Sequence, residues 1–487
     1  MAVARKIAYI VVLNSFLKVF STVALSLLSI RLITGYLGQD GFGNYATILA
    51  LFAFFSAIAD LGIGAVTARE ISREGADEGK ILGHVISLRI LSAAAFVLLS
   101  PIVIFFFDYP RDVEIGILIA AVATIFSTLS LTLNGIFQKH LAMDKVAMVE
   151  FLGKLLQVGA VFLIVKADWG FLAIAATLLV SLSWNALVVL LISRRYTTFR
   201  LHIDTAAWKE FLRESWPMGM TAIITFAYFK MDTILLSVLQ TSSEVGIYNV
   251  AYKIMENLVF FPAMLAGLVL PLLSRSIFTD RARFQEIANK TFKVFFIIVL
   301  PLVIATWFLA DDIVAIVSGA GFLEAAPVLR MLIFALGFIF FGHFFNMLLI
   351  VGNAQKKLMQ VLVIAAVFNI LANLYLIREY SYIGAAMAAI GTEMLVVLLT
   401  GFLTYRYIRF LPSFENIGRI ALSGAAMVAA LFFLEPFSFL LSGIASVATY
   451  VLVLWLTNAV NHTEIASLFQ KGGSSPEEAE HIETMLP

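Results

Sequence analysis

The sequence predicts an all-α protein that crosses a membrane about fourteen times. Hydrophobic residues make up 61% of the 487 residues and charged residues only 13%, and the mean hydropathy is +0.97. A soluble chain of this length could not keep so much apolar surface away from water. The apolar residues also gather into runs of about 20 residues, the helical length that crosses the core of a bilayer. Composition and pattern together place the chain in a membrane.

The apolar segments follow one another from end to end, with short polar connections between them. The first segment is too long and too polar for a cleaved signal peptide, so we interpret it as a permanent helix. Six segments precede a basic linker, six follow it, and two more precede a polar, acidic tail. In chain order the segments are 7–33, 42–65, 81–107, 113–137, 146–165, 169–192, 216–239, 245–273, 291–309, 327–351, 358–377, 382–405, 417–434 and 437–456.

The charges in the connections predict the orientation of the chain. With the amino terminus in the cytoplasm, 23 Lys and Arg lie on the cytoplasmic side and 3 on the outer side, although the net charge of the whole chain is only +1. This is the asymmetry of the positive-inside rule. We therefore expect a multi-pass protein of the cytoplasmic membrane with both termini in the cytoplasm. The longest outer connection, 310–326, leaves no room for a folded outer domain.

Two short patterns recur in corresponding places of the two halves. Gly43-x-Tyr45 follows the first helix of its half and Gly246-x-Tyr248 follows the seventh segment, whereas Gln-Lys follows the fourth helix of each half at 138–139 and 355–356. These repeats predict two six-helix lobes. Because six is even, both halves enter from the same side and are related by an axis along the membrane normal.

The predicted organisation has five parts. The linker could be an interfacial amphipathic helix with Trp208, Phe211 and Leu212 on one face, or simply a basic connection. We expect the tail to be disordered. The parts are lobe 1–192, linker 193–215, lobe 216–410, two extra transmembrane helices at 411–460, and the cytoplasmic acidic tail 461–487.

Several stretches resemble the polysaccharide transporter (flippase) family, which groups with multidrug and toxin extrusion transporters and lipid II flippases. They are Arg31-Leu-Ile-Thr-Gly-Tyr-Leu-Gly-Gln-Asp-Gly-Phe-Gly-Asn-Tyr45, Asp60-Leu-Gly-Ile-Gly64, Lys230-Met-Asp232 and Glu244-Val-Gly-Ile-Tyr-Asn-Val-Ala-Tyr-Lys253. The resemblance implies a V-shaped bundle of two lobes. It also implies that a lipid-diphosphate-linked oligosaccharide moves to the outer leaflet by alternating access, often coupled to an ion, for surface polysaccharide assembly.

Charged residues inside the segments are the candidate functional residues, because a charge in hydrocarbon is costly and faces protein or a wet cavity. Cations outnumber anions there, which suits an anionic headgroup that Arg and Lys can bind. The candidates for binding substrate are Lys18, Arg31, Arg89, Lys230 and Lys253. The candidates for coupling to H+ or Na+ are Asp60, Asp232, Glu256 and Glu393.

Each candidate also has a structural interpretation. Asp60 could pair with Lys18 or with Arg89, which lie at different depths. In the densest group, Lys230–Glu256 and Asp232–Lys253 could pair across helices and form a closed network. Glu393 has no basic residue within four positions and could be a protonated carboxyl group that hydrogen-bonds a neighbouring helix. Arg31 and Arg330 could extend to the membrane surface, and Glu150 and Lys154 have the spacing of a structural pair.

Other motifs limit the alternatives. Pro262 is the first choice for a bend that gates transport, because proline frees a backbone carbonyl group. Without cysteine, a phosphate-binding loop or metal-spaced histidines, the chain predicts no cofactor, no metal, no nucleic-acid partner and no enzyme. We expect a monomer whose partners are membrane lipid and the lipid-linked oligosaccharide. The alternatives are an ion-coupled drug or cation antiporter, which would prefer an acidic cavity, and a polysaccharide polymerase or ligase, which would need a long outer loop.

Overall fold

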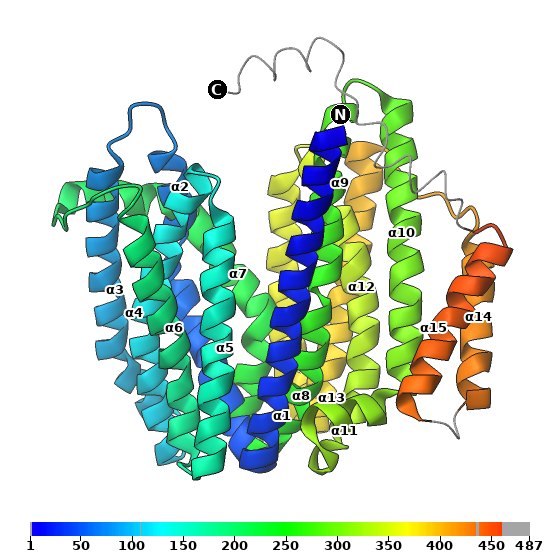
Figure 1. Ribbon diagram of the computed structural model, residues 1–487, viewed down its shortest axis with the longest axis horizontal. Helices are drawn as coiled ribbons and strands as arrows, with labels where there is room; N and C mark the ends of the chain where they lie inside the picture. The colour runs from blue at the N-terminus through cyan, green and yellow to red at the C-terminus, as the bar shows by residue number, and fades with distance from the viewer. Residues whose placement is uncertain (1, 108, 435–437, 460–487) are drawn as a thin grey trace. The chain divides into compact units, whose positions relative to one another are not determined.

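The computed structural model describes residues 2–107, 109–434 and 438–459, with side chains from residue 23 onward except 96, 99, 103, 104 and 106. Every regular element in these residues is a helix (Figure 1). Twelve helical stretches are long and apolar enough to cross a membrane. The prediction of an all-α, polytopic membrane protein is confirmed. The acidic tail 461–487 lies outside the described residues.

The helices follow the predicted segments closely. In the first part of the chain they are α1 (Ala2–Asp60), α2 (Ile63–Ile71), α3 (Glu78–Phe106), α4 (Arg111–Lys139), α5 (Met143–Ala167), α6 (Phe171–Ser193), α7 (Thr205–Leu239) and α8 (Ser242–Leu258). In the second part they are α9 (Phe260–Ser276), α10 (Arg281–Phe308), α11 (Ala310–Ser318), the 3-10 turn η1 (Ala320–Phe322), α12 (Ala325–Val351), α13 (Gln355–Leu403), the π-helical turn η2 (Thr404–Ile408), α14 (Ile417–Leu434) and α15 (Phe439–Leu456).

Two sharp kinks explain why fourteen predicted segments become twelve stretches. The first two segments run together in α1, which bends at Gly38 with φ 67° and ψ −170°. The eleventh and twelfth run together in α13, which bends at Ser381 with φ 51° and ψ −133°. Ser381 also donates a hydrogen bond from its hydroxyl group to Glu244, at 2.6 Å. Each kink replaces a loop that hydropathy alone would place between two helices.

Two predicted spans are interrupted in the structure. The segment 42–65 is not one helix, because α1 ends at Asp60 and α2 begins at Ile63, after two residues with positive φ, Leu61 and Gly62. The segment 245–273 breaks at Val259, between α8 and α9. Pro262 explains that second break, because it lacks the N–H group that would bond to the carbonyl group of Leu258. Val259 itself keeps helical dihedral angles, φ −61° and ψ −21°, so only the hydrogen bonding is interrupted there, and a bend at Pro262 that gates transport stays a prediction.

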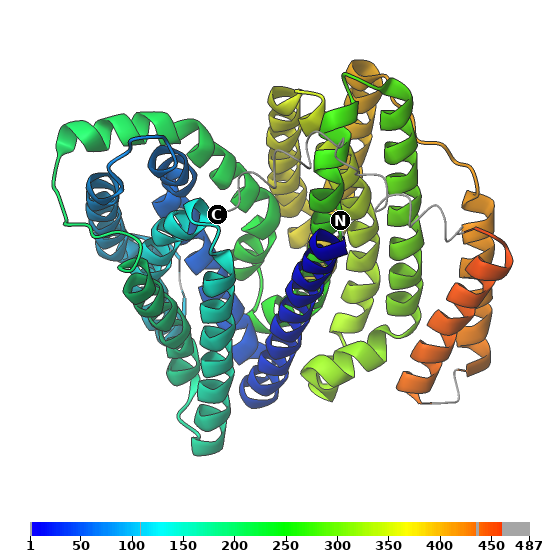
Figure 2. The same ribbon diagram turned by 45° about the horizontal axis from the view of Figure 1, so that its top comes forward.

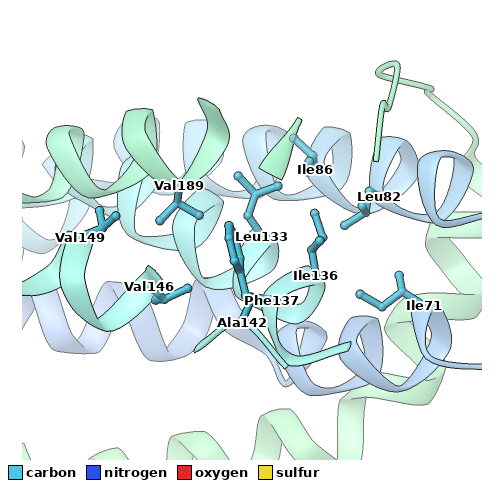
Figure 3. Close-up of a cluster of buried hydrophobic side chains, with 10 residues drawn as sticks. All are labelled: Ile71, Leu82, Ile86, Leu133, Ile136, Phe137, Ala142, Val146, Val149 and Val189. Atoms are coloured by element: carbon cyan, nitrogen blue, oxygen red, sulfur yellow. The ribbon is translucent and has the colours of Figure 1, made fainter. Parts of the chain in front are cut away.

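The chain divides into two compact units that we describe separately. The first contains Met1–Ile254, Val314–Val328 and Leu362–Ala389. Within it, helices α2 to α6 bring their apolar side chains together in one buried cluster (Figure 3). The cluster removes these side chains from both lipid and water, and it fixes α2 beside α3 and α4. Its members are Ile71, Leu82, Ile86, Leu133, Ile136, Phe137, Ala142, Val146, Val149 and Val189.

The second unit contains Met255–Ile313, Leu329–Val361 and Ile390–Pro487. Its last two helices, α14 and α15, form a hairpin that packs on α10; Figure 2 shows the hairpin in orange to red. The hydroxyl group of Tyr450 donates to the carbonyl oxygen of Ile297 at 2.9 Å. A side chain at Gly424 would press on Leu300 and Ile304 of α10, so the small residue permits this close approach.

The linker 193–215 packs on protein. Asp204 caps α7 by accepting bonds from the amides of Ala206 and Ala207, and these bonds lower the pKa of Asp204. Trp208 is 9% exposed and donates from its indole N–H to the carbonyl oxygen of His84, at 2.9 Å. Trp208 and Phe211 belong to a core cluster with residues of α2 and α3. Of the two interpretations left open for this face, the burial of Trp208 against α2 and α3 favours a packed connection at that residue, whereas Phe211 is only half-buried.

Candidate functional site

A buried ion pair lies at the break between α1 and α2. The guanidinium group of Arg89, on α3, donates to the carboxylate of Asp60, the last residue of α1, at 2.5 Å. The Arg89 side chain is 1% exposed and that of Asp60 is 21% exposed. The expected neutralisation of Asp60 by Arg89 is confirmed. Among the described residues, the Nε and Nη1 atoms of Arg89 have no hydrogen-bond partner, so this arginine keeps donors that an anion could use.

The side chain of Lys18 lies outside the described residues. The alternative pairing of Lys18 with Asp60 therefore stays a prediction. The close packing at the break between α1 and α2 does not depend on whether Lys18 pairs with Asp60. A Cβ atom at Gly62 would lie 2.7 Å from the backbone nitrogen of Gly219 on α7. The interruption of the second span is thus held against α7 by backbone contact.

A second polar group lies where α7 meets α8. The carboxylate of Asp232 accepts hydrogen bonds from the hydroxyl group of Tyr248 and, at 2.7 Å, from the backbone amide of Thr233. The hydroxyl group of Thr233 in turn donates to the side-chain carbonyl of Asn249 at 3.3 Å. Asp232 is 5% exposed. Hydrogen bonds from neutral donors stabilise a buried carboxylate and fix its position.

Lysines lie close to this group. The amine of Lys230 lies over the ring of Tyr252, 4.6 Å from its centroid, and the hydroxyl group of Tyr252 donates to the carbonyl oxygen of Phe229 at 2.6 Å. Lys253 follows Tyr252 in the sequence and lies in the same helix, α8. The cross-helix pairs Lys230–Glu256 and Asp232–Lys253 stay predictions.

Lys154 differs from its sequence-based interpretation. Among the described residues it forms no ion pair with Glu150, four residues earlier. Its amine instead donates to the side chain of Gln157 at 3.1 Å. Sequence reasoning counted Lys154 as half of a structural pair, because the i, i+4 spacing permits one. The sequence feature that would have indicated this bond is a lysine near the middle of a span with a glutamine, Gln157, three residues further on.

The two copies of the Gly-x-Tyr pattern contact each other directly. A Cβ atom at Gly43 would overlap the carbonyl oxygen of Ser242, and one at Gly246 would overlap the carbonyl oxygen of Gln39. The contact is reciprocal, because Gln39 and Ser242 each precede their glycine by four residues. Two side-chain hydrogen bonds flank it, from Ser242 to Asn44 at 2.7 Å and from Ser243 to Gln39 at 2.5 Å.

This reciprocal glycine crossing joins α1 and α8 through their backbones. Glycine is required on both sides, since any side chain would separate the two helices. The sequence shows that the Gly-x-Tyr pattern occurs twice, and the structure shows that the two copies are in contact. In the first copy of the second repeated pattern, Lys139 pairs with Glu78 and donates to the carbonyl oxygen of Ile71 at 2.7 Å.

The remaining candidates are dispersed. Arg31 is exposed, and its guanidinium group lies against Gly319, where a Cβ atom would be 2.6 Å away. Arg330 pairs with Asp311 and donates to the carbonyl oxygen of Trp307 at 3.0 Å. Glu256 and Glu393 belong to the second compact unit, and Glu393 is 8% exposed.

The first compact unit therefore gathers Arg31, Asp60, Arg89, Lys230, Asp232 and Lys253. In the described part of the chain, no group of three or more acidic, His or Cys residues could hold a metal ion. The chemistry available is the reversible binding of an anion or a proton by charged side chains within a membrane bundle.

Comparisons with known proteins agree with this arrangement. The chain is 23% identical over 425 residues to the probable low-salt glycan biosynthesis flippase Agl15 of Haloferax volcanii, which covers 84% of this chain and 86% of the relative. It is 24% identical over 240 residues to the probable flippase AglR of the same organism, which covers 47% of this chain and 50% of the relative.

Two solved structures have a similar fold. Lipid II flippase MurJ in an inward closed conformation superposes with a TM-score of 0.75 at 18% identity, covering 91% of this chain and 98% of the other. An inward-facing multidrug resistance transporter of the MATE family and MOP superfamily superposes with a TM-score of 0.65 at 15% identity, covering 80% and 95%. At these identities the likeness shows the fold alone.

A family model settles the relationship. The model described as "Polysaccharide biosynthesis protein" matches residues 3–277, more than half of the chain. The resemblance carried by the stretches around Gly43-x-Tyr45 and Gly246-x-Tyr248 is thereby confirmed. This multi-pass membrane protein belongs to the polysaccharide biosynthesis protein family.

Proposed function

We propose that the protein is a flippase, which carries a lipid-diphosphate-linked oligosaccharide from the cytoplasmic to the outer leaflet for surface polysaccharide assembly. The observation that carries this proposal is the set of cationic side chains inside the spans of the first compact unit. The names of the related flippases support it, because transport of a lipid-linked glycan needs an anion-binding path through the membrane. A cationic drug would be repelled by the same side chains, so nothing favours the antiporter alternative.

The residues have two proposed roles. Arg89, Lys230 and Lys253, together with Lys18 and Arg31, bind the diphosphate at successive stages of transport. Lysine acts as a point charge and arginine as a fork that can bind two oxygens at once. Acidic residues near these lysines and arginines couple the transport of the lipid to H+ or Na+. A carboxylate that binds H+ or Na+ loses its negative charge and attracts a nearby lysine or arginine less strongly. The proposed coupling residues are Asp60, Asp232, Glu256 and Glu393.

The organisation predicted from the sequence completes the proposal. The protein acts as a monomer in the cytoplasmic membrane with both termini in the cytoplasm, and its two six-helix lobes, 1–192 and 216–410, move in alternating access. The linker 193–215 joins the lobes, and the helices of 411–460 are additions to them. The bias of 23 to 3 in Lys and Arg between the two sides supports the orientation.

Complementation tests the function. The gene is expressed in a strain that lacks its own glycan flippase, and the surface glycan is quantified. We expect the wild type to restore export, and the variants Arg89→Gln, Lys230→Gln and Lys253→Gln to reduce it at equal abundance in the membrane. Lys209→Gln, on the exposed face of the linker, is the matched control. Unchanged export in all three variants would refute the assignment of these residues, and failure of the wild type in every glycan background would refute the function.

A further inference from the structure

Part of the linker lies against the start of α3 through its backbone. Residues 197–204, which we call the linker segment, have no helical structure. A Cβ atom at Gly79 would overlap the carbonyl oxygen of Thr198, and one at Gly83 would overlap that of Arg200. A backbone hydrogen bond of 3.4 Å from the linker segment to the carbonyl oxygen of Gly83 adds to this contact. The two glycines, about one helical turn apart, therefore fix the linker segment on one side of α3.

The same side of α3 faces lipid further along the helix. Ile90 lies about two helical turns after Gly83, so its side chain is on nearly the same side. Ile90 is exposed, as are Leu91 and Leu98, and exposed apolar side chains of a spanning helix contact lipid. The linker segment lies about 10 Å nearer to the start of α3, which the distribution of Lys and Arg assigns to the cytoplasmic side. It therefore lies at the level expected for lipid headgroups.

Two apolar side chains of the linker segment are left uncovered by protein. Leu201 is 60% exposed and Ile203 is 82% exposed. The helical part of the linker differs, because Trp208 and Phe211 belong to a core cluster with residues of α2 and α3. Leu201 and Ile203 are thus the apolar surface that the packing of the linker leaves open. Apolar side chains in such a position enter the boundary between headgroups and acyl chains.

Cationic side chains accompany these two residues. Arg194 and Arg195 precede the linker segment in the sequence, Arg200 belongs to it, and Lys80 lies beside it on α3, next to Gly79; all four are exposed. Within the part of the chain that the structure describes, none of the four forms an ion pair. Their charges are therefore available to an external anion.

The carboxylates close to the linker segment are already engaged. Asp77 accepts from the backbone amide of Lys80 at 3.0 Å, and Asp204 accepts from two amides of the first turn of α7 at 2.9 and 3.2 Å. Glu78 pairs with Lys139. The surface keeps an excess of positive charge, and a group of four or more Lys and Arg beside the cytoplasmic end of a span is the pattern that binds anionic lipid.

We propose that the linker segment is an interaction surface for anionic phospholipids of the cytoplasmic leaflet. Leu201 and Ile203 enter the boundary between headgroups and acyl chains, and the four cations bind the phosphate groups around them. The partner is the surrounding bilayer and not the transported lipid, so the inference goes beyond the proposed function and does not depend on it. Its physical basis is the combination of an apolar tip, unpaired cations and a lipid-facing helix beneath them.

Quenching by brominated lipids tests the surface. The chain contains no cysteine, so Ile203→Cys can carry a single bimane label while Leu201 stays in place. The labelled full-length protein is reconstituted in vesicles with equal amounts of phosphatidylcholine and phosphatidylglycerol, the same in both leaflets. Bromine is placed on the acyl chains of one lipid at a time. We expect brominated phosphatidylglycerol to quench more strongly, with a preference of about fivefold for each cation in contact, and the preference should fall at high salt.

Two variants separate the charges from the apolar tip. Replacing Arg194, Arg195 and Arg200 together by Gln should make the two brominated lipids quench almost equally, while the label stays in the bilayer. Replacing the same three residues by Lys should keep the preference for phosphatidylglycerol. Thermal unfolding checks that the Gln variant is folded, and Arg200→Gln alone is the second variant if it is not.

Glu74→Cys is the matched control for the label, because Glu74 lies in the exposed turn between α2 and α3. A label there should be quenched weakly by both lipids. Absence of quenching at position 203 would overturn the inference, since the linker segment would then lie in water or beneath another protein. Equal quenching by the two lipids in the wild type, or an unchanged preference in the Gln variant, would overturn the role of the cations and with it the anionic partner.

Discussion

The reciprocal glycine crossing makes a quantitative prediction for Gly43→Ala. The new methyl group would overlap the carbonyl oxygen of Ser242 and lie 2.9 Å from the backbone nitrogen of Gly246. Both atoms belong to the backbone, so α1 and α8 must move apart. Overpacking costs about 1–3 kcal/mol, and the loss of one or two flanking hydrogen bonds adds about 1 kcal/mol each. The helix propensity of alanine returns about 1 kcal/mol, which leaves a net destabilisation of about 1–4 kcal/mol.

The assay is equilibrium unfolding in detergent, followed by tryptophan fluorescence. Gly159→Ala is the matched control, because a Cβ atom at Gly159 on α5 would have no neighbour within 4 Å. That variant should be as stable as the wild type or more stable by about 0.5–1 kcal/mol, since it removes the entropic cost of a glycine in a helix. Gly246→Ala should match Gly43→Ala, because the contact is reciprocal.

Cross-linking measures the separation of the helices directly. The chain contains no cysteine, so the pair Gln39→Cys and Ser243→Cys can be introduced without a background. Their side-chain oxygens lie 2.5 Å apart in the wild-type chain, and a short thiol-specific bifunctional reagent, which replaces the length of the glutamine side chain, should join the cysteines that replace them. Adding Gly43→Ala should lower the yield of the cross-linked product. If Gly43→Ala and Gly159→Ala are equally stable and cross-linking is unaffected, the close backbone contact does not exist.

Three further variants test other parts of the structure in the same unfolding assay. Asp60→Asn leaves the buried guanidinium group of Arg89 without its charged partner and should cost about 3–5 kcal/mol; adding Arg89→Met should recover much of the loss, and an additive double variant would contradict the pairing. Trp208→Phe removes the donor to the carbonyl oxygen of His84 and should cost about 1–3 kcal/mol; no loss would mean that water replaces the indole. The pKa of Asp204 is lowered by the backbone amides that it caps, so the contribution of this cap to stability is complete above the unfolded pKa of about 3.9 and is lost as the pH falls through the lower folded pKa. Amide exchange in the first turn of α7 should become faster over that pH range. In Asp204→Ala, the same amides should exchange fast at every pH.

The membrane character of the protein could be predicted from the sequence, because the length of an apolar span depends on the bilayer alone. The family could be predicted from the stretches around Gly43-x-Tyr45 and Gly246-x-Tyr248. The kinks could not. Gly38 and Ser381 both lie in short polar stretches between predicted segments, 34–41 and 378–381, and hydropathy cannot distinguish a bent helix from two helices joined by a loop. Pro262 was recognisable because its missing N–H group acts locally. The break at Leu61 and Gly62 depends on contact with α7, which no local pattern records.

The candidate site shows the same division. The pairing of Asp60 with Arg89 followed from depth along two helices, and the structure contains it. The surroundings of Trp208 stayed open in the sequence, because hydropathy cannot tell whether an apolar face meets lipid or protein. Lys154 was misread because i, i+4 spacing permits a pair without requiring one, and the side chain bonds to Gln157 instead. Contacts within one helix are ambiguous in sequence whenever several partners lie within reach.

The crossing of Gly43 and Gly246 has a consequence for the history of the chain. A two-fold axis between identical subunits makes each contact twice: where residue i of one subunit contacts residue j of the other, residue j of the first also contacts residue i of the second. The Gly43–Ser242 and Gly246–Gln39 contacts have this pattern. Here a single polypeptide makes such an isologous contact with itself. A half-length ancestor that paired with its own copy would have used this glycine once and gained the interface twice. A fusion of two such copies would keep a glycine on each side of the crossing, because a side chain on either side would separate the two backbones.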